Sequence, residues 1–494
     1  MSAAALTASG CFLDGDDEAK RGPLRPEEVN TLLIVTDSTR SDYIGAYGGG
    51  RAETPNIDAL AKEGIRFTRP RPEAMPTVPM RRALLTGHRS YPFRDWQVED
   101  KMPPFPGWNG IPAGRPTFPE LMKRRAITTA YVTDNPFLIG PRFTEFRSTR
   151  ALDVSEPLYI QGEYRNSYNT PLPEGALASE AEVARYLLPG LAGTSNLQKL
   201  REYVGLNIAM GRRREKQYAA ARVIGGGMEL LPKLKRRRPF FLGVDAFDPH
   251  EAFDPPPSYK RRFDDHRGVE PILPFKSPFS RVADIDISDE QIERVRELYA
   301  AEMTFVDAWI GRLLNKLDDE GLADSTAVVY VSDHGVYLGE RGLLGKYAPA
   351  IHREIYDVPW IMRHPEGKRS GETSDWFASP HDVAPTLLGF HGMRAGGGMD
   401  GEDLSVMFRD REPPARPYWT TSYSSAVGAG DGRYLLISDN QGEDRRLFDT
   451  RADPRERRDV ASAKPGVVKR LWRNLVDDAG GSMPVFGENG VIRG

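Results

Sequence analysis

Residues 31–37 read TLLIVTD, an unbroken apolar run that ends in polar side chains. A short run that is apolar throughout indicates a strand with both faces covered, as in a parallel sheet. Three other short runs have the same apolar character, at 128–132, 240–244 and 326–331. The sequence therefore predicts a buried, mostly parallel sheet.

Helical patterns fall between these runs. The longest, over 289–320, carries apolar residues at helical spacing, and shorter patterns cover 55–62, 179–188 and 217–231. Three consecutive glycines weaken the middle of the last of these. Strands that alternate with helices are typical of an α/β fold in which helices sandwich a mostly parallel sheet.

The character of the chain changes after about residue 400. The stretches 433–437 and 446–449 read as strands, and 467–478 reads as a terminal helix. We therefore expect three parts: a leader or linker, a main catalytic α/β domain and a small C-terminal α+β subdomain, over residues 1–29, 30–400 and 401–494.

The bulk composition excludes several classes of protein. Of 494 residues, 39% are apolar and 28% charged, so a sizeable core can form, and the formal net charge of -3 argues against a nucleic-acid partner. No stretch approaches the ~20 apolar residues of a transmembrane span. The single cysteine, Cys11, allows neither an internal disulfide nor a thiolate metal cluster. The oligomeric state is not readable from the sequence.

The sequence at the N-terminus is compatible with two cellular locations. The stretch from Ala8 to Cys11 looks like the end of a bacterial lipoprotein signal, although the charged start and the long apolar run of such a signal are absent. The protein is then either cytoplasmic, with Cys11 an ordinary tail residue, or attached to the cell envelope through a truncated signal.

Two strand ends present possible metal ligands. Asp37 ends the first predicted strand, and Asp333 with His334 follows the run 326–331. In open parallel sheets, ligands bind beyond the carboxyl ends of the strands, where distant parts of the chain converge. Carboxylate and imidazole ligands without cysteine suit a divalent cation such as Mn²⁺, Zn²⁺, Mg²⁺ or Ca²⁺. Taken singly, each aspartate could also be a simple turn or cap residue.

Residues 77–87 read TVPMRRALLTG. This stretch resembles the sulfatase signature: Cys or Ser, any residue, Pro, any residue, Arg, and then a Thr-Gly pair at the same spacing. Further segments resemble motifs of the sulfatase family and occur in the family's order, at 37–48, 54–61, 332–340, 345–346, 358–361, 382–388 and 447–456. The resemblance spans roughly residues 31 to 460. It implies an alkaline-phosphatase-like fold and a metal-dependent ester hydrolase.

The resemblance also implies roles for the residues of the site. Asp37, Asp333 and His334 would hold the metal, with the oxygen of Thr77 as a further ligand and as the catalytic nucleophile. If Thr77 opens a helix, Arg81 shares its face and can reach the nucleophile.

Four more residues match substrate-side positions of the family. Lys346 would bind a non-bridging ester oxygen, and His250 would contact the substrate or protonate the leaving group. Tyr131 and Thr133 resemble substrate-binding residues of the branch that cleaves phosphonates and phosphodiesters. The ordinary readings stay open for these residues: a surface lysine, a loop histidine, and packing side chains for the last two.

Thr77 departs from the family pattern. Ordinary sulfatases convert the signature Cys or Ser into formylglycine, an aldehyde, whereas oxidation of a threonine would yield a ketone. We therefore expect no formylglycine and an unmodified Thr77 nucleophile. Related phosphodiesterases and lipoteichoic-acid synthase-like phosphotransferases use a threonine in this way, through a covalent phosphothreonine.

Ser38 is a second departure, because many sulfatases carry another metal-binding aspartate there. The remaining ligand set resembles that of single-metal relatives, which favour Mn²⁺. We expect one metal ion rather than two.

Three functions remain. The favoured one is hydrolysis or transfer of a phosphodiester or phosphonate through Thr77. A formylglycine hydrate can expel sulfate by collapsing to the aldehyde, whereas a threonine ester of sulfate cannot. The alternatives are a sulfuric ester hydrolase and a catalytically inactive binding protein that keeps the fold. The substrate is an anionic ester, small or linked to a glycan or lipid. We expect its specificity to lie in the loops 96–120, 140–180 and 250–285.

Overall fold

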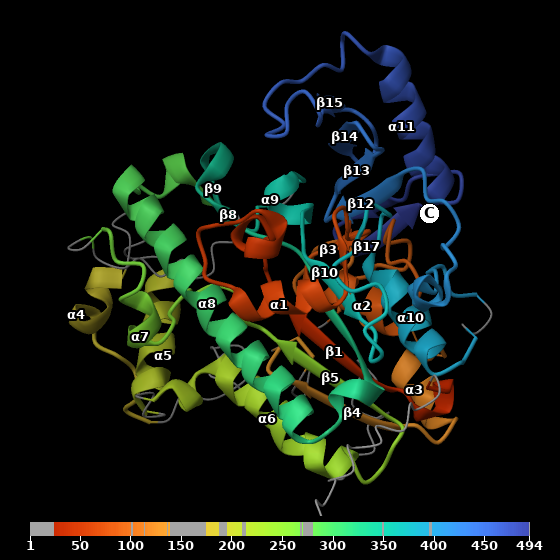
Figure 1. Ribbon diagram of the computed structural model, residues 1–494. Coiled ribbons are helices and arrows are strands. Elements are labelled where there is room, and N and C mark those ends of the chain that lie inside the picture. The colour runs from red at the N-terminus through yellow and green to blue at the C-terminus, as the bar shows by residue number, and fades with distance from the viewer. Residues whose placement is uncertain are drawn as a thin grey trace, which may run out of the picture.

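A computed structural model describes most of the chain. It covers residues 24–99, 102–112, 114–135, 137–138, 174–186, 195–209, 214–266, 269, 280–347, 350–394 and 398–493. The possible lipoprotein cysteine, Cys11, and nearly all of the predicted loop 140–180 lie outside these residues. Figure 1 shows a central sheet between helices, with a smaller sheet beside it towards the C-terminus.

The central sheet has seven strands in the order β11-β2-β10-β7-β1-β5-β4. Four of them confirm the strands that the apolar runs predict, and these four pair in parallel: β1 (Asn30–Thr36), β4 (Thr128–Thr133), β5 (Phe240–Ala246) and β7 (Thr326–Ser332). The predicted mostly parallel sheet is therefore confirmed.

Three strands at one edge of this sheet were not predicted. They are β2 (Ile65–Phe67), β10 (Trp360–Arg363) and β11 (Thr373–Ser374), and β10 runs antiparallel to both of its neighbours. These strands have two to four residues. Segments this short show no period of their own, and the partner strands decide their conformation.

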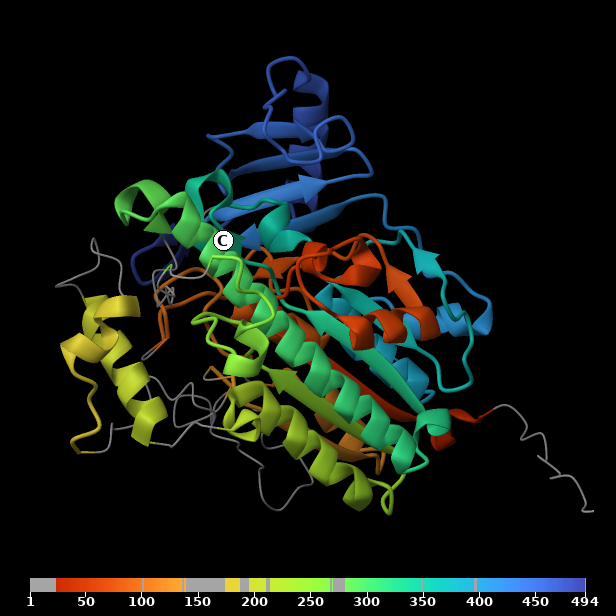
Figure 2. The ribbon, with the colours of Figure 1, turned by 60° about the vertical axis from the view of Figure 1, so that its left-hand side comes forward.

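Helices cover both faces of the sheet, as the views in Figures 1 and 2 show. Side chains alternate along β1, so Leu32 and Ile34 join one core cluster and Leu33 and Val35 join the other. The first cluster packs under α1 (Pro55–Glu63), α6 (Ala219–Leu234) and α8 (Asp289–Asp319), and the second under α2 (Thr77–Thr86), α3 (Phe118–Lys123) and α10 (Val383–Phe390).

The predicted helices are confirmed. For one of them, predicted over 179–188, the last two residues lie outside the described part of the chain. The helix α6 continues through its three glycines, and a Cβ at Gly227 would lie 2.7 Å from a methyl group of Val244, so the glycine lets helix and sheet approach closely. The pattern over 179–188 begins as α4 (Glu180–Val183) with a Ser179 cap and continues as a 3-10 turn to Tyr186. Residues 187 and 188 lie outside the described residues.

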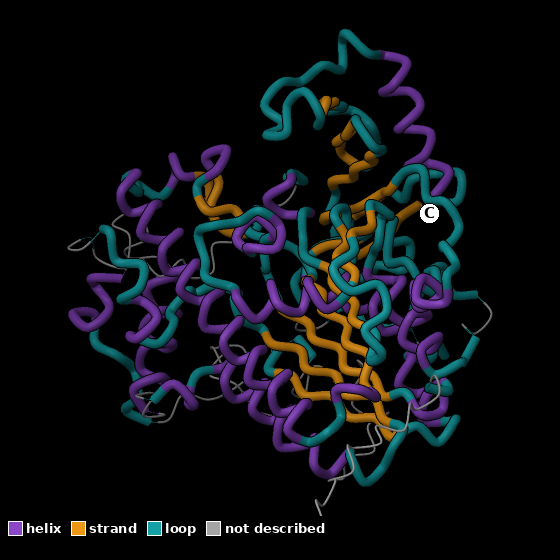
Figure 3. The backbone as a smooth tube through the Cα atoms, in the orientation of Figure 1, coloured by secondary structure: helices purple, strands orange, loops and turns teal. Residues whose placement is uncertain are grey.

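Shorter elements surround this framework (Figure 3). They comprise the helices α5 (Ser195–Ala209), α7 (Pro257–Lys260) and α9 (Arg353–Tyr356), and a small sheet of β6 (Ser280–Arg281), β9 (Leu343–Gly345) and β8 (Tyr337–Leu338). Among the described residues, no helix has the combination of length and apolar character that crossing a membrane requires.

The C-terminal region forms a second sheet of five strands in the order β15-β14-β13-β12-β3. The strands predicted at 433–437 and 446–449 and the terminal helix are confirmed. The elements are β12 (Trp419–Tyr423), β13 (Ala426–Gly430), β14 (Tyr434–Asp439), β15 (Arg446–Asp449), α11 (Pro465–Asp478), β16 (Val485–Gly487) and β17 (Gly490–Arg493).

One strand of this second sheet comes from the N-terminal part of the chain. The strand β3 (Ala74–Met75) pairs in parallel with β12 and ends two residues before Thr77. We propose a subdomain boundary near residue 400, across which β3 ties the C-terminal sheet to the segment that leads into α2.

Candidate active site

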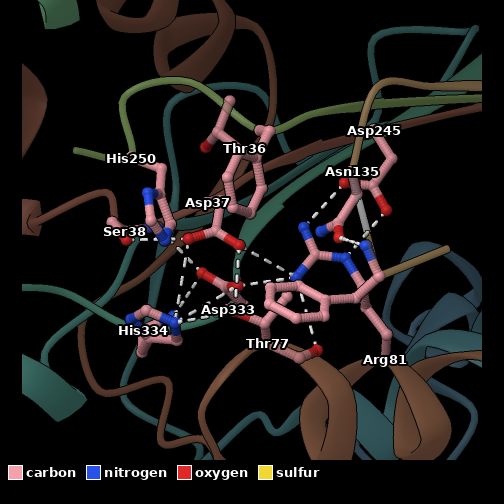
Figure 4. A network of polar contacts seen from close by, with 12 residues as sticks. Thr36, Asp37, Ser38, Thr77, Arg81, Asn135, Asp245, His250, Asp333 and His334 are labelled. Atoms are coloured by element: carbon pink, nitrogen blue, oxygen red, sulfur yellow. Dashed lines mark hydrogen bonds and ion pairs between the residues drawn. The ribbon is translucent and has the colours of Figure 1, made fainter. Parts of the chain in front are cut away.

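Three predicted metal ligands meet at the carboxyl end of the central sheet. Asp37 directly follows β1 and Asp333 directly follows β7, and these parallel neighbours are in register at Thr36 and Ser332. Asp37, Asp333 and His334 are fully buried, and each offers a ligand atom within 4.8 Å of the others. Figure 4 shows these side chains pointing toward one another.

Hydrogen bonds hold these ligands in place. Ser38 has a φ of 62°, in the left-handed region, and its backbone N–H donates to Asp333 Oδ1 at 2.9 Å. Its hydroxyl donates to Asp37 Oδ1 at 2.7 Å. His334 Nδ1 lies 2.8 Å from the carbonyl oxygen of Gly335, so this nitrogen carries the proton and Nε2 keeps its lone pair for a metal.

The electrostatics of this cluster fit a divalent cation. Burial and the neighbouring Asp333 carboxylate raise the pKa of Asp37. Burial lowers the pKa of His334 to about 4, so its imidazole is neutral at neutral pH. Two buried carboxylates and a neutral imidazole supply the oxygen and nitrogen donors of Mn²⁺, Zn²⁺, Mg²⁺ and Ca²⁺ sites.

Thr77 is the first residue of α2 and is only 1% exposed. Its Oγ1 lies 3.3 Å from Asp37 Oδ2 and 3.5 Å from His334 Nε2, so it completes the predicted ligand set. The first turn of a helix also favours negative charge, because its backbone N–H groups have no partner within the helix. A threonine oxygen at this point is well placed to carry developing negative charge.

Arg81 extends from the same face of α2, as its spacing from Thr77 predicts. Its Nη1 lies 2.6 Å from Asp333 Oδ2 and 3.3 Å from Asp37 Oδ2. Burial alone would lower the pKa of Arg81, but Asp245, Asp333 and Asp37 together hold it well above its ordinary value. The guanidinium is therefore a permanent cation behind the metal ligands.

Asp245 is a site residue that the sequence reasoning missed. It lies one residue before the end of β5, is fully buried, and accepts hydrogen bonds from Arg81 Nε at 2.9 Å and Nη2 at 2.7 Å. Such a two-point contact fixes both the position and the plane of a guanidinium. The available signal was an aspartate near the end of a buried strand, the same signal that identified Asp37.

Tyr131 and Thr133 lie at the end of β4, next to β5. The Tyr131 hydroxyl donates to Asp245 Oδ2 at 2.8 Å, so the tyrosine supports the partner of Arg81. The Thr133 hydroxyl accepts a hydrogen bond from the backbone of Asn135 at 3.0 Å. Both hydroxyls thus have protein partners in this structure. That Tyr131 and Thr133 bind the substrate stays a prediction from the sequence.

His250 and Lys346 lie together, as a second polar group of the site. Lys346 Nζ donates to His250 Nε2 at 2.9 Å and also contacts the Glu251 carboxylate. His250 Nδ1 lies 2.8 Å from the Glu251 carbonyl oxygen, and its ring stacks on Phe247. Figure 4 shows His250 beside Asp37 and Ser38. Glu251 is the other residue that the sequence reasoning missed.

The charges within this group are set by burial and contact. Burial and the Lys346 ammonium lower the pKa of His250 to about 4, so the ring is neutral near neutral pH. Burial acts to raise the pKa of Glu251, but Lys346 and His250 outweigh it and lower the pKa to about 2. At neutral pH a buried lysine–glutamate ion pair therefore lies beside a neutral histidine that accepts a hydrogen bond from the lysine.

Known proteins resemble this chain over most of its length. Residues 29–393 match the family model described as Sulfatase. An ulvan-active sulfatase of Formosa agariphila is 26% identical over 83% of this chain and 71% of its own length. A multifunctional alkaline phosphatase superfamily protein of Trinickia caryophylli is 24% identical over 78% of each chain.

Solved structures share the fold. A phosphonate monoester hydrolase from Silicibacter pomeroyi superposes with a TM-score of 0.67 and 20% identity, covering 94% of this chain and 99% of that one. The family model and this shared fold agree with the architecture and with the order of the sequence motifs. The chain therefore belongs to the sulfatase family, within the alkaline phosphatase superfamily, and is an ester hydrolase of that type.

Proposed function

We propose that this protein cleaves, or transfers, a phosphodiester or phosphonate ester with the unmodified Thr77 hydroxyl as its nucleophile. The observation that carries this proposal is the position of Thr77 Oγ1, at the start of α2 and 3.3 Å from Asp37 Oδ2. The hydroxyl has one side against the ligand cluster and lies at a helix end that favours negative charge.

The ligand set for a divalent cation comprises Asp37, Thr77, Asp333 and His334. When bound by these side chains, such an ion polarises an ester oxygen and favours the ionised form of the threonine hydroxyl. We favour one ion, with Mn²⁺ as its preferred identity, because Ser38 offers no carboxylate.

The chain's own residues then account for two displacement steps. In the first, Thr77 Oγ1 forms a bond to phosphorus, the bond from phosphorus to the leaving oxygen breaks, the hydroxyl proton passes to Asp37 Oδ2, and the leaving oxygen takes a proton from solvent. In the second, the oxygen of water or of an acceptor alcohol bonds to phosphorus and gives its proton to solvent, the bond to Thr77 breaks, and Thr77 regains its proton from Asp37. Arg81 stabilises the charge that develops on the ester oxygens in both steps.

His250 and Lys346 serve the opposite side of the ester in this proposal. A histidine with a pKa of about 4 is a poor proton source at neutral pH. His250 instead accepts a hydrogen bond from Lys346 and so fixes the direction of the ammonium group. Lys346 is then the residue that binds a non-bridging oxygen or the leaving oxygen.

A sulfuric ester is the second candidate substrate. The relatives named above include an ulvan-active sulfatase, and further ones are an arylsulfatase of Clostridium perfringens and an N-acetylglucosamine-6-O-sulfatase of Bacteroides thetaiotaomicron. Against this candidate stands the threonine: its sulfate ester cannot collapse to an aldehyde and must be opened by direct attack.

A panel of aryl esters with one common leaving group tests the proposal. It contains a sulfate, a phosphate monoester, a phosphodiester and a phosphonate monoester. We expect the highest kcat/KM for the diester or the phosphonate and loss of all activities in Thr77→Ala. Thr77→Ser, which keeps the hydroxyl, should retain turnover. A preference for the sulfate by several orders of magnitude would refute the phosphoryl assignment.

A further inference from the structure

Among the described residues, the two cationic side chains of this site, Arg81 and Lys346, each contact a carboxylate of their own. Arg81 forms a two-point contact with Asp245, and both side chains are completely buried. Lys346 contacts Glu251, and these side chains are 10% and 9% exposed. Asp245 and Glu251 are not part of the expected metal ligand set, since Asp37, Asp333 and His334 form that cluster.

Each of these two carboxylates is in direct contact with a cation. Asp245 accepts two hydrogen bonds from the Arg81 guanidinium, and Glu251 contacts the Lys346 ammonium. Burial acts to raise the pKa of Glu251, but Lys346 and His250 outweigh it and lower the pKa to about 2, so Glu251 is negatively charged across the neutral range. The remaining polar partner, His250, is neutral there.

Within the part of the chain that the structure describes, the consequence is a site without surplus positive charge. A divalent ion between Asp37 and Asp333 meets two negative charges, and the two protein cations are each balanced by one carboxylate. The cost of placing an anion in a buried site of low dielectric grows with the square of its charge. Such a site disfavours a doubly charged substrate far more strongly than a singly charged one.

We propose that Glu251 and Asp245 are specificity-determining residues that make this site select singly charged esters over doubly charged phosphate monoesters. This inference rests on the proposed function, because it concerns the substrate of the same Thr77 site. Sulfate monoesters, phosphodiesters and phosphonate monoesters each carry one charge, so all three remain acceptable to a neutral site.

The test compares Glu251→Gln with the wild type on a phosphodiester and a phosphate monoester that share a leaving group. Removing the negative charge beside Lys346 should lower the diester-to-monoester ratio of kcat/KM by about tenfold or more. Glu251→Asp keeps the charge and should keep the ratio. Glu320→Gln removes a partner of Lys316 on the surface of the protein and should change neither activity.

Binding provides a readout that does not depend on turnover. At about pH 8 inorganic phosphate carries two charges and dimethyl phosphate one. Calorimetry on the protein, with and without added metal, should show that Glu251→Gln tightens phosphate by about tenfold and dimethyl phosphate by much less. Asp245→Asn provides the same comparison if Glu251→Gln does not fold.

An equal effect on both substrates and on both ligands would overturn the inference and assign the carboxylates a purely structural role. This failure is distinct from failure of the proposed function. If Thr77→Ala abolishes turnover while the ratio stays unchanged in both carboxylate variants, only the specificity inference falls. If Thr77→Ala keeps full turnover, the nucleophile assignment falls first.

Discussion

Arg81 and Asp245 form a fully buried two-point ion pair, with nitrogen–oxygen distances of 2.9 and 2.7 Å. The pair leaves Arg81 Nη1 free to lie 2.6 Å from the metal-ligand carboxylate of Asp333. The guanidinium thus connects three strand ends, and its plane is determined by Asp245.

This geometry predicts that Arg81→Lys is not a conservative change. A lysine has a single ammonium group and cannot contact Asp245 at two points while it also reaches Asp333. We expect kcat/KM to fall by about 100-fold or more, the loss typical of removing a group that stabilises transition-state charge. The measurement is steady-state kinetics on the best substrate of the panel.

Arg82→Lys is the matched control for this prediction. Arg82 is the next residue of α2 and is also buried, but its partners are Asn109 and Asp95 rather than site residues. It should lose stability without a comparable loss of kcat/KM. Equal losses in the two variants would contradict the role assigned to Arg81.

The metal site predicts one bound divalent ion per chain. Elemental analysis of purified Asp333→Asn should show that the ion is lost, because the variant removes one of two carboxylates in the cluster. A chelator should lower the melting temperature of the wild type and leave that of the variant nearly unchanged.

A buried aspartate outside the site is the control here. Asp307 accepts hydrogen bonds from the backbone of Ile57 and the side chain of Asn56, at the start of α1. Asp307→Asn should destabilise the protein and keep its metal content. Two stoichiometric ions in the wild type would reject the single-metal proposal.

Stability should depend on pH through a buried histidine far from the chemistry. Burial lowers the pKa of His391 to about 4, and its Nε2 bonds to the Thr31 hydroxyl at 3.0 Å. An unfolded histidine has a pKa of about 6.5. Between these two pKa values His391 is protonated in the unfolded chain and neutral in the folded chain. The free energy of unfolding therefore decreases as pH falls through this window.

His391→Gln removes that proton uptake. Urea unfolding at pH values of about 7 and 5 should show a loss of stability that is smaller than the wild-type loss by about 1–2 kcal/mol. In His266 the sign is opposite, because a hydrogen bond to Glu297 raises its pKa. His266→Gln should therefore not reduce the loss of stability between these pH values. The same loss of stability in the wild type and in His391→Gln would contradict the account.

Much of the fold follows from simple sequence patterns. Runs that are apolar throughout identify β1, β4, β5 and β7, because a parallel strand with both faces covered has apolar side chains on each face. The two residues of β3 carry no such pattern. They become a strand only because β12, more than three hundred residues later in the chain, offers a partner.

The candidate site follows the same rule. Asp37, Asp333 and His334 are visible in the sequence because they end predicted strands and fall within spaced motifs. Asp245 also lies near a strand end, but its meaning depends on Arg81, which is 164 residues away in sequence. Glu251 depends in the same way on Lys346, 95 residues later. A charge that matters only through a distant partner leaves no local signal.

The account's central claim concerns the oxygen of Thr77. The most direct measurement is intact-mass analysis after a brief pulse of phosphodiester substrate and acid quench, followed by peptide mapping. We predict a phosphoryl adduct, or a sulfuryl adduct with a sulfate ester, on Thr77 alone, and its absence in Thr77→Ala. Turnover without any adduct at Thr77, or with the adduct on another residue, would contradict the claim.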